Sequence, residues 1–181
     1  MNKRYINWDQ YAGLVQEVCR QITVSNWRPD YVVGITRGGL LPGKMISHYL
    51  EVPMHTIKVS LRDNADTESN LWMAEDAFGY VPEEDQPVVN SRWDPSYRKN
   101  ILIVDDINDS GATINWILDD WPSGCLPQSD VWKTVWNNNV RFAMVFDNLR
   151  SKSNIKVDYT GEELDKSETD WIVFPYEDWW R

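Results

Sequence analysis

The chain has 181 residues, of which 42% are hydrophobic, and a formal net charge of −10. This length suits one α/β domain with a substantial core, so residues 1–181 are taken as a single domain. The acidic balance argues against a nucleic-acid-binding protein, which would carry a basic stripe. There is no apolar run of membrane-spanning length, no signal-peptide pattern and no disulfide framework from the two cysteines, so no membrane partner and a cytoplasmic location are expected.

The first part of the chain alternates between helical and extended patterns. Apolar residues spaced three and four apart predict a helix over 8–22, with Asn7 and Gln10 as its capping box. Cys19 falls on the apolar face of this helix and is expected to be a buried thiol. The pattern then predicts a buried strand over 31–36, a turn over 37–39, a helix over 40–50 and a strand over 54–60.

Residues 61–98 form a long insertion that is polar, acidic and weakly patterned, with prolines at 82, 87 and 95. A long insertion of this kind in a compact domain is often a lid or flexible loop. The alternative is an edge hairpin in which 78–81 pairs with 88–89. The two interpretations are compatible, and both are kept.

The remaining elements continue the alternation. A buried strand is predicted over 101–104, a helix over about 113–120, a second buried strand over 140–146, a polar loop over 151–167 and an extended segment over 170–176. Strands that alternate with helices indicate a mostly parallel, twisted sheet flanked by helices, with ligands at the carboxyl ends of its strands. Four tryptophans are expected to pack together: Trp116, Trp121, Trp132 and Trp136.

The segment 101–113 carries the most chemistry, because a buried strand runs into an acidic pair, Asp105 and Asp106, and a small turn then opens a helix. The first N–H groups of a helix have no partner within it and can hold an anion. Four residues of the turn are therefore expected to surround a monophosphate: Ser110, Gly111, Ala112 and Thr113. In the alternative, the hydroxyl of Ser110 or Thr113 merely caps the helix.

The carboxylates beside this turn suit partners other than phosphate. Asp105 and Asp106 can accept hydrogen bonds from neighbouring ribose hydroxyls, provided that the strand end turns, because strand alternation alone sends them to opposite faces. Alternatively, one of the two is structural. They are also the expected ligands of Mg²⁺, which prefers hard oxygen donors. Asp109 lies beside the turn and is the candidate catalytic acid or base, with a helix-dipole contact as the alternative.

A second turn, over residues 36–39, follows the strand at 31–36. Gly38 and Gly39 permit close approach of the backbone to an oxyanion, and Arg37 adds a planar donor fork suited to phosphate oxygens. The chain contains neither a dinucleotide-binding glycine fingerprint nor a Walker loop, which argues against NAD or ATP chemistry.

Together, the motifs at 104–113 and 35–43 resemble those of the type I phosphoribosyltransferases, with the second motif similar to the pyrophosphate loop of the bacterial xanthine–guanine branch. The resemblance covers about residues 30–60 and 100–147, with a weaker match at 156–177. It implies the fold of that family, with a small C-terminal hood over about 148–181 that recognises the base and a lid within 61–98.

The resemblance also implies roles for individual residues. Phosphoribosyl diphosphate (PRPP) would be bound by Arg37, Gly38, Gly39, Asp105, Asp106, Asp109, Ser110, Gly111, Ala112 and Thr113, often next to a non-proline cis peptide bond. Mg²⁺ would lie near Asp106. The base would be bound by Trp171, Ile172, Arg150 and Glu177, with Trp171 stacking on the ring. Core packing is the alternative role of Trp171.

The implied reaction is transfer of phosphoribose from PRPP to a 6-oxopurine with release of pyrophosphate, by a homo-oligomer, dimer or tetramer. One departure concerns the lysine that these enzymes place after the strand at 140–146. Here Asn148, Arg150 or Lys152 would substitute for it. Transfer to a pyrimidine or another base, and a non-catalytic PRPP or nucleotide sensor, are the alternatives.

Overall fold

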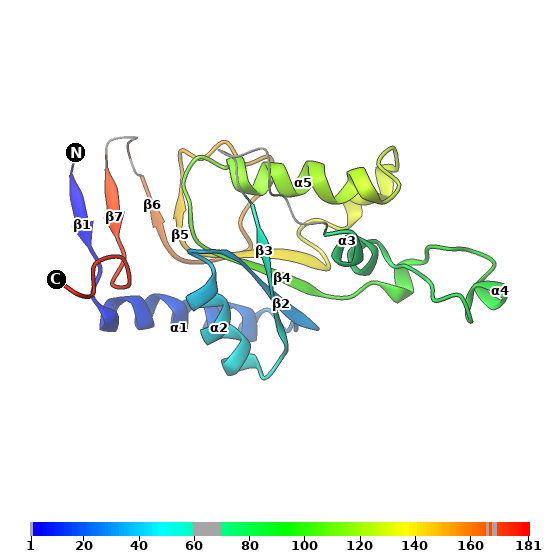
Figure 1. Cartoon of the computed structure of the whole chain (residues 1–181), viewed down its shortest axis with the longest axis horizontal. Coiled ribbons are helices and arrows are strands. Elements are labelled where there is room, and N and C mark those ends of the chain that lie inside the picture. The colour runs from blue at the N-terminus through cyan, green and yellow to red at the C-terminus, as the bar shows by residue number, and fades with distance from the viewer. Residues whose placement is uncertain (1, 60–69, 166, 168–169) are drawn as a thin grey trace.

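The computed structural model describes residues 2–59, 70–165, 167 and 170–181. Within these ranges, a parallel sheet of five strands has the order β3-β2-β4-β5-β6 (Figure 1). These strands are β2 (Tyr31–Thr36), β3 (Met54–Lys58), β4 (Ile101–Asn108), β5 (Val140–Asn148) and β6 (Tyr159–Leu164). Every pairing in this sheet is parallel, which confirms the predicted α/β fold.

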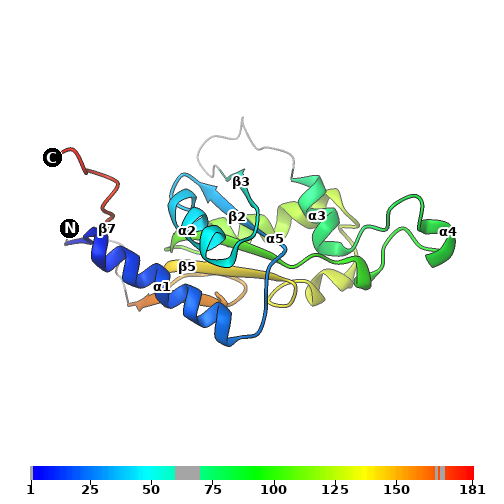
Figure 2. The same ribbon diagram turned by 90° about the horizontal axis from the view of Figure 1, so that it is seen from below.

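Helices cover both faces of the sheet (Figures 1 and 2). Alternation along β4 sends Ile101 and Ile103 to a core that includes residues of α3 (Leu71–Phe78) and α5 (Ala112–Gly124). Leu102 and Val104 join the opposite core, with α1 (Trp8–Val24) and α2 (Leu40–Leu50). β4 is therefore buried on both faces and fixes the position of whatever follows it.

The N-terminal helix follows its sequence pattern closely. Asn7 and Gln10 form the predicted capping box, with the Gln10 N–H donating to Asn7 Oδ1 at 2.8 Å and the Asn7 N–H to Gln10 Oε1 at 2.9 Å. Cys19 is buried, as predicted. The helix packs against β5 and β6, and so it helps to hold the edge of the sheet that β6 forms.

The described part of the insertion, residues 70–98, differs from the hairpin expected there. Residues 61–69 lie outside the described ranges, so the lid prediction is left as an expectation there. The rest forms α3, whose Met73 and Phe78 are buried in the core, α4 (Gln86–Val89) and a 3₁₀ turn η1 (Pro95–Tyr97). A hairpin-like bridge does occur, but Tyr80 pairs with Trp93, because 88–89 belong to α4.

Several predicted boundaries were too short. β4 runs to Asn108 rather than 104, so both Asp105 and Asp106 lie in the strand. α5 runs to Gly124, because Pro122 lies in its last turn, where the missing N–H removes a single helical hydrogen bond. The polar stretch 151–167 contains β6, an edge strand in which Tyr159 alone is fully buried and which therefore carries little apolar signal.

A small second sheet joins the two ends of the chain. β1 (Lys3–Tyr5) pairs in parallel with β7 (Trp171–Val173), and the register places Lys3 opposite Trp171. The extended segment predicted over 170–176 is therefore a strand in part, whereas β1 was missed because its three residues are all exposed. The pairing attaches the predicted hood to the start of α1.

The tryptophan cluster is confirmed for three of its members. The ring centroids of Trp132 and Trp136 lie 5.5 Å apart, and those of Trp121 and Trp136 lie 6.0 Å apart. Trp116 is partly buried against the same core. None of the helices in the described ranges combines the length and hydropathy of a membrane span.

Candidate active site

The two sequence motifs meet at the carboxyl ends of neighbouring strands. β2 pairs with β4 from Tyr31 opposite Ile101 to Gly34 opposite Val104, so the turn after β2 faces the residues that follow Val104. A Cβ built on Gly38 would lie 2.2 Å from Asp106 Oδ2. The Asp106 carboxylate therefore packs directly against the Gly38 backbone, and a side chain at this position would force the carboxylate to move.

A cavity of about 630 Å³ opens at this contact. It is lined by Arg37, Gly38, Asp106, Tyr176, Glu177 and Trp180. The first three were predicted as donor-binding residues and Glu177 as a base-binding residue. The peptide bond between Thr36 and Arg37 is cis, as the family resemblance implied.

Gly39 completes the turn after β2. Its own Cβ would lie 2.2 Å from the Val104 carbonyl oxygen and 2.6 Å from the Ile35 nitrogen. The absence of a side chain at Gly39 thus lets the turn close onto β4, which brings Arg37 and Gly38 to the cavity.

The two aspartates of the acidic pair, Asp105 and Asp106, interact directly with each other. The Asp106 N–H donates to Asp105 Oδ1 at 2.9 Å, and both aspartates lie in β4 beyond its last pairing with β2. Burial and the neighbouring Asp106 charge raise the pKa of Asp105 well above its usual range. Burial also raises the pKa of Asp106, against the opposing effect of the Tyr176 hydrogen bond. Asp106 lines the cavity and Asp105 does not.

The turn that was predicted to bind phosphate is built around Gly111. This residue is the N-cap of α5 and has a φ of 86°, in the left-handed region that glycine adopts freely. A Cβ there would lie 2.3 Å from the Ser153 nitrogen, so the close approach belongs to the chain's own 152–153 backbone. The Lys152 N–H donates to the Ser110 carbonyl at 2.9 Å, and Ser110 Oγ accepts from the Ala112 N–H at 3.3 Å.

The Lys152 and Ser153 backbone thus packs against the predicted phosphate turn, and α5 begins after Gly111 with a helix N-terminus at Ala112 and Thr113. A helix N-terminus favours an anion. The turn itself is not part of the wall of the 630 Å³ cavity.

Asp109 is held by a residue of the neighbouring strand. The buried side-chain amide of Asn148, at the end of β5, donates to Asp109 Oδ1 at 3.0 Å and to the Asp109 carbonyl at 3.3 Å. Asn148 was one of three suggested substitutes for the missing lysine. Of the other two, Arg150 pairs with Asp165 at the surface, and the Lys152 main chain binds the phosphate turn.

The predicted base-binding residues are only partly brought together. Glu177 lines the cavity, and its side chain accepts a hydrogen bond from the Phe174 N–H at 2.8 Å. Trp171 is 49% exposed in β7, so it is not a core residue, and Ile172 is buried. The cavity wall does not include Trp171, Ile172 or Arg150. The base-binding roles of these three residues remain predictions.

Two lining residues had been given no role. Tyr176 Oη donates to Asp106 Oδ2 at 2.8 Å. Burial and the nearby Asp106 charge raise the pKa of Tyr176, so that its hydroxyl is a donor at neutral pH. Trp180 lies in the terminal Trp-Trp-Arg sequence, which has no periodicity that would have singled it out.

The carboxylate oxygens of Asp105 and Asp106 are donors of the type that Mg²⁺ prefers. Across the residues that the structure describes, no three His, Cys, Asp or Glu side chains gather into a metal site. Mg²⁺ usually takes one or two carboxylates together with water and substrate phosphates. Asp106 at the cavity wall, with Asp105 beside it, offers that type of incomplete oxygen site.

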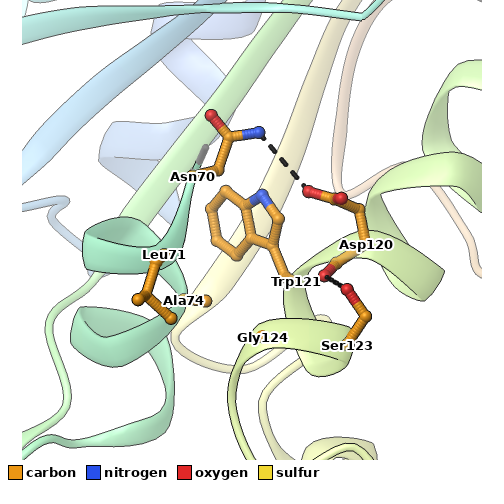
Figure 3. Close-up of a pocket in the computed structure, with 7 residues that line it drawn as sticks. All are labelled: Asn70, Leu71, Ala74, Asp120, Trp121, Ser123 and Gly124. Atoms are coloured by element: carbon orange, nitrogen blue, oxygen red, sulfur yellow. Dashed lines mark hydrogen bonds between the residues drawn. The ribbon is translucent and has the colours of Figure 1, made fainter. Parts of the chain in front are cut away.

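A second, smaller cavity of about 120 Å³ lies between α3 and α5 (Figure 3). Asn70 Nδ2 approaches Asp120 Oδ2 at 3.5 Å above the Trp121 indole. Trp121 Nε1 is buried and has no hydrogen-bond partner among the described residues. The lining contains none of the predicted site residues, so this cavity is separate from the candidate active site.

Comparison with known proteins agrees with this geometry. A xanthine phosphoribosyltransferase of Saccharomyces cerevisiae is 24% identical over 152 residues, which cover 81% of this chain and 73% of that protein. The structure of a Pyrococcus horikoshii purine phosphoribosyltransferase matches with a TM-score of 0.62 and 22% identity, covering 98% of this chain and 96% of that one.

A Helicobacter pylori xanthine–guanine–hypoxanthine phosphoribosyltransferase matches with a TM-score of 0.62 and 16% identity over 98% of this chain and 95% of that chain. These two solved structures show a shared fold. The family model described as the phosphoribosyl transferase domain matches residues 3–178, nearly the whole chain. The two motifs therefore predicted the family correctly, and the chain belongs to the phosphoribosyl transferase domain family.

Proposed function

We propose that this protein transfers the phosphoribosyl group from PRPP to a purine base, with release of pyrophosphate and with Mg²⁺ bound. The observation that carries the proposal is the contact of the Arg37–Gly38 turn with the Asp106 carboxylate at the wall of a 630 Å³ cavity. It places a cationic donor fork beside a carboxylate that can bind ribose hydroxyls. The names of the relatives, which act on xanthine, guanine, hypoxanthine or purines, support the choice of base.

In this mechanism each part of PRPP has its own binding element. Arg37 and the Gly38–Gly39 backbone bind the pyrophosphate, Asp106 and Asp105 accept hydrogen bonds from the ribose hydroxyls, and Ser110 to Thr113 bind the 5′-phosphate. Asp106, with Asp105 beside it, would hold Mg²⁺, which would supply positive charge for the pyrophosphate. Substrate binding at three places orients the ribose C1 atom for attack.

The reaction replaces one bond at ribose C1 with another. The bond from C1 to a pyrophosphate oxygen breaks while a nitrogen of the base bonds to C1. The ribose ring carries positive charge in the transition state. Asp109 accepts the proton that the base nitrogen loses, as a general base. Asn148 donates to Asp109 Oδ1 and so restricts the orientation of this carboxylate.

The identity of the base is tested with a panel. Pyrophosphate release is measured with PRPP, Mg²⁺ and each of xanthine, guanine, hypoxanthine, adenine, uracil and orotate. Turnover of a 6-oxopurine is the expected result, and turnover of a pyrimidine alone would move the proposal to the alternative base class. If the protein binds PRPP and Mg²⁺ but turns over no base, it is a sensor rather than an enzyme.

A homo-oligomer, dimer or tetramer, is part of the proposal. It is supported by large aromatic side chains that are exposed in the single chain, among them Trp8 at 52% and Trp72 at 44%. Light scattering coupled to size-exclusion chromatography should give a mass of two or four chains. A mass of one chain at micromolar concentration would contradict this part of the proposal.

A further inference from the structure

The C-terminal segment makes a direct contact with the acidic pair that neither motif predicts. Tyr176 Oη donates to Asp106 Oδ2 at 2.8 Å, across 70 positions of sequence. Both residues line the same cavity. The hydroxyl therefore binds one of the two oxygens with which Asp106 would meet a ribose hydroxyl or a metal.

The Tyr176 ring is held firmly by other aromatic rings. It stacks on buried Phe174, with centroids 5.4 Å apart and an interplanar angle of 3°. Tyr11 of α1, itself buried, meets it edge-on, with centroids 5.8 Å apart at 89°. Glu177 closes the turn below by accepting from the Phe174 N–H. A ring packed in this way keeps its hydroxyl in one place.

The Asp106 carboxylate is thus confined from two directions. Gly38 lies against it, because a Cβ on Gly38 would come within 2.2 Å of Oδ2 and 2.6 Å of Oδ1. Tyr176 binds Oδ2. Packing against Gly38 restricts the orientation of the carboxylate, and the hydrogen bond then selects which oxygen remains available to a ligand.

We propose that Tyr176 is a positioning residue that fixes the Asp106 carboxylate in the orientation needed to bind the ribose of PRPP. The inference rests on the proposed function, because it assigns PRPP to this cavity. Its rival is that the hydroxyl is a placeholder, which a ribose hydroxyl displaces when PRPP binds. The two readings predict opposite effects of removing the hydroxyl, because a placeholder competes with the ligand and a positioning group assists it.

The test is Tyr176→Phe, which keeps the stacked ring and removes only the hydroxyl. Isothermal titration with PRPP in the presence of Mg²⁺ should show a dissociation constant roughly 10–100-fold higher, the range for a lost hydrogen bond to a charged group. In steady-state assays the KM for PRPP should rise by the same factor, with a smaller change in kcat and an unchanged KM for the base. Tighter binding of PRPP, or unchanged binding, would overturn the inference.

Tyr31→Phe is the matched control. Tyr31 Oη also donates to an aspartate, Asp76 Oδ2 at 2.9 Å, but this pair is not part of the cavity wall. The control should lose stability without any change in PRPP affinity. If the wild-type protein itself neither binds PRPP nor turns over a base, the proposed function fails, and that outcome is separate from failure of the Tyr176 inference.

A second variant tests the same idea without touching the hydroxyl. Phe174→Leu loosens the stack that holds Tyr176, and Phe174 does not line the cavity. It should weaken PRPP binding several-fold in the wild-type background and have no further effect in the Tyr176→Phe background. Equal effects in both backgrounds would show that Phe174 acts independently of Tyr176, contrary to the inference.

Discussion

At the scale of single residues, two carboxylates of the candidate active site differ in what holds them. Asp106 is half-buried and is confined between Gly38 and Tyr176, whereas Asp109 lies at an exposed turn and is held by the buried Asn148 amide. A confined carboxylate suits ligand binding, because its geometry is set before the ligand arrives. A more accessible one suits the removal of a proton from a nucleobase that enters from solvent.

Asp109→Ala should therefore reduce turnover while leaving PRPP bound. We expect kcat to fall by about 10²–10⁴-fold, the usual contribution of a general acid or base. The dissociation constant for PRPP with Mg²⁺, measured by isothermal titration, should change little. Asp119→Ala, at an exposed position on α5, is the control and should keep full activity. Loss of PRPP binding in the Asp109 variant would assign this residue to the donor rather than to the base.

Gly38→Ala should remove activity while preserving the fold. The added Cβ would overlap the Asp106 carboxylate at 2.2 Å, so the carboxylate must move. A displacement of about 1 Å can cost 10²-fold, and we expect at least that loss in kcat/KM for PRPP. Gly13→Ala is the matched control, because nothing lies within 4 Å of its Cβ, and it should stabilise α1 by about 0.5–1 kcal/mol. An active Gly38 variant would disprove the close contact.

At the scale of elements, α1 links the core to the site. Its inner face buries Val15, Val18, Cys19 and Ile22, and Tyr11 on the same face supports Tyr176. Pairing of β1 with β7 then anchors the segment that carries Tyr176 beside the start of this helix. Mutations in the packing of α1 should consequently affect both stability and the geometry of the cavity.

The buried Cys19 thiol should make the free energy of unfolding depend on pH. Burial raises the pKa of its thiol from 9.0 to about 11. The folded state binds the thiol proton more tightly than the unfolded state does. The contribution of this thiol to the free energy of unfolding is therefore fully present below pH 9 and is lost as the pH rises toward 11. At pH 10 this loss is about 1.4 kcal/mol, one pKa unit.

Cys19→Ala, which cannot titrate, escapes that loss. Its destabilisation, measured by urea unfolding, should be about 1.4 kcal/mol smaller at pH 10 than at pH 7. Val18→Ala, at a buried neighbour without a titrating group, should cost the same at both pH values. A Cys19 variant that also shows equal costs would mean that the thiol ionises as freely in the folded state as in the unfolded state.

At the scale of the whole molecule, the two ends of the chain come together at one end of the structure. The segment that carries α4 extends from the other end (Figures 1 and 2). The pyrophosphate turn, the acidic pair and the C-terminal segment come from distant parts of the sequence and meet only in the folded protein. A ligand that contacts all three should therefore bind the folded state alone and stabilise the whole domain.

PRPP with Mg²⁺ should raise the melting temperature. At a concentration 100 times the dissociation constant, binding adds about 2.7 kcal/mol, which corresponds to roughly 5–11 °C for a domain of this size. Differential scanning fluorimetry measures the shift, and EDTA should remove most of it if Mg²⁺ is part of the complex. A melting temperature that is the same with and without PRPP would contradict the assignment of the cavity to this ligand.

The amino-acid sequence by itself determined the α/β class, the main helices and inner strands, the family and the residues of the two turns. These features are local: buried strands show as apolar runs, helices as three-and-four spacing, and the turns as glycine and hydroxyl residues in order. Strands with little buried surface, β1 and β6, gave no such signal and were missed.

Only the tertiary structure decided which predicted residues face the same cavity. The contacts of Tyr176 with Asp106 and of Asn148 with Asp109 join positions 70 and 39 residues apart. They depend on strand order, on the register of β4 with β2 and β5, and on the pairing of β1 with β7. No local pattern encodes these, because a side chain's partner across the sheet is set by how separate elements pack.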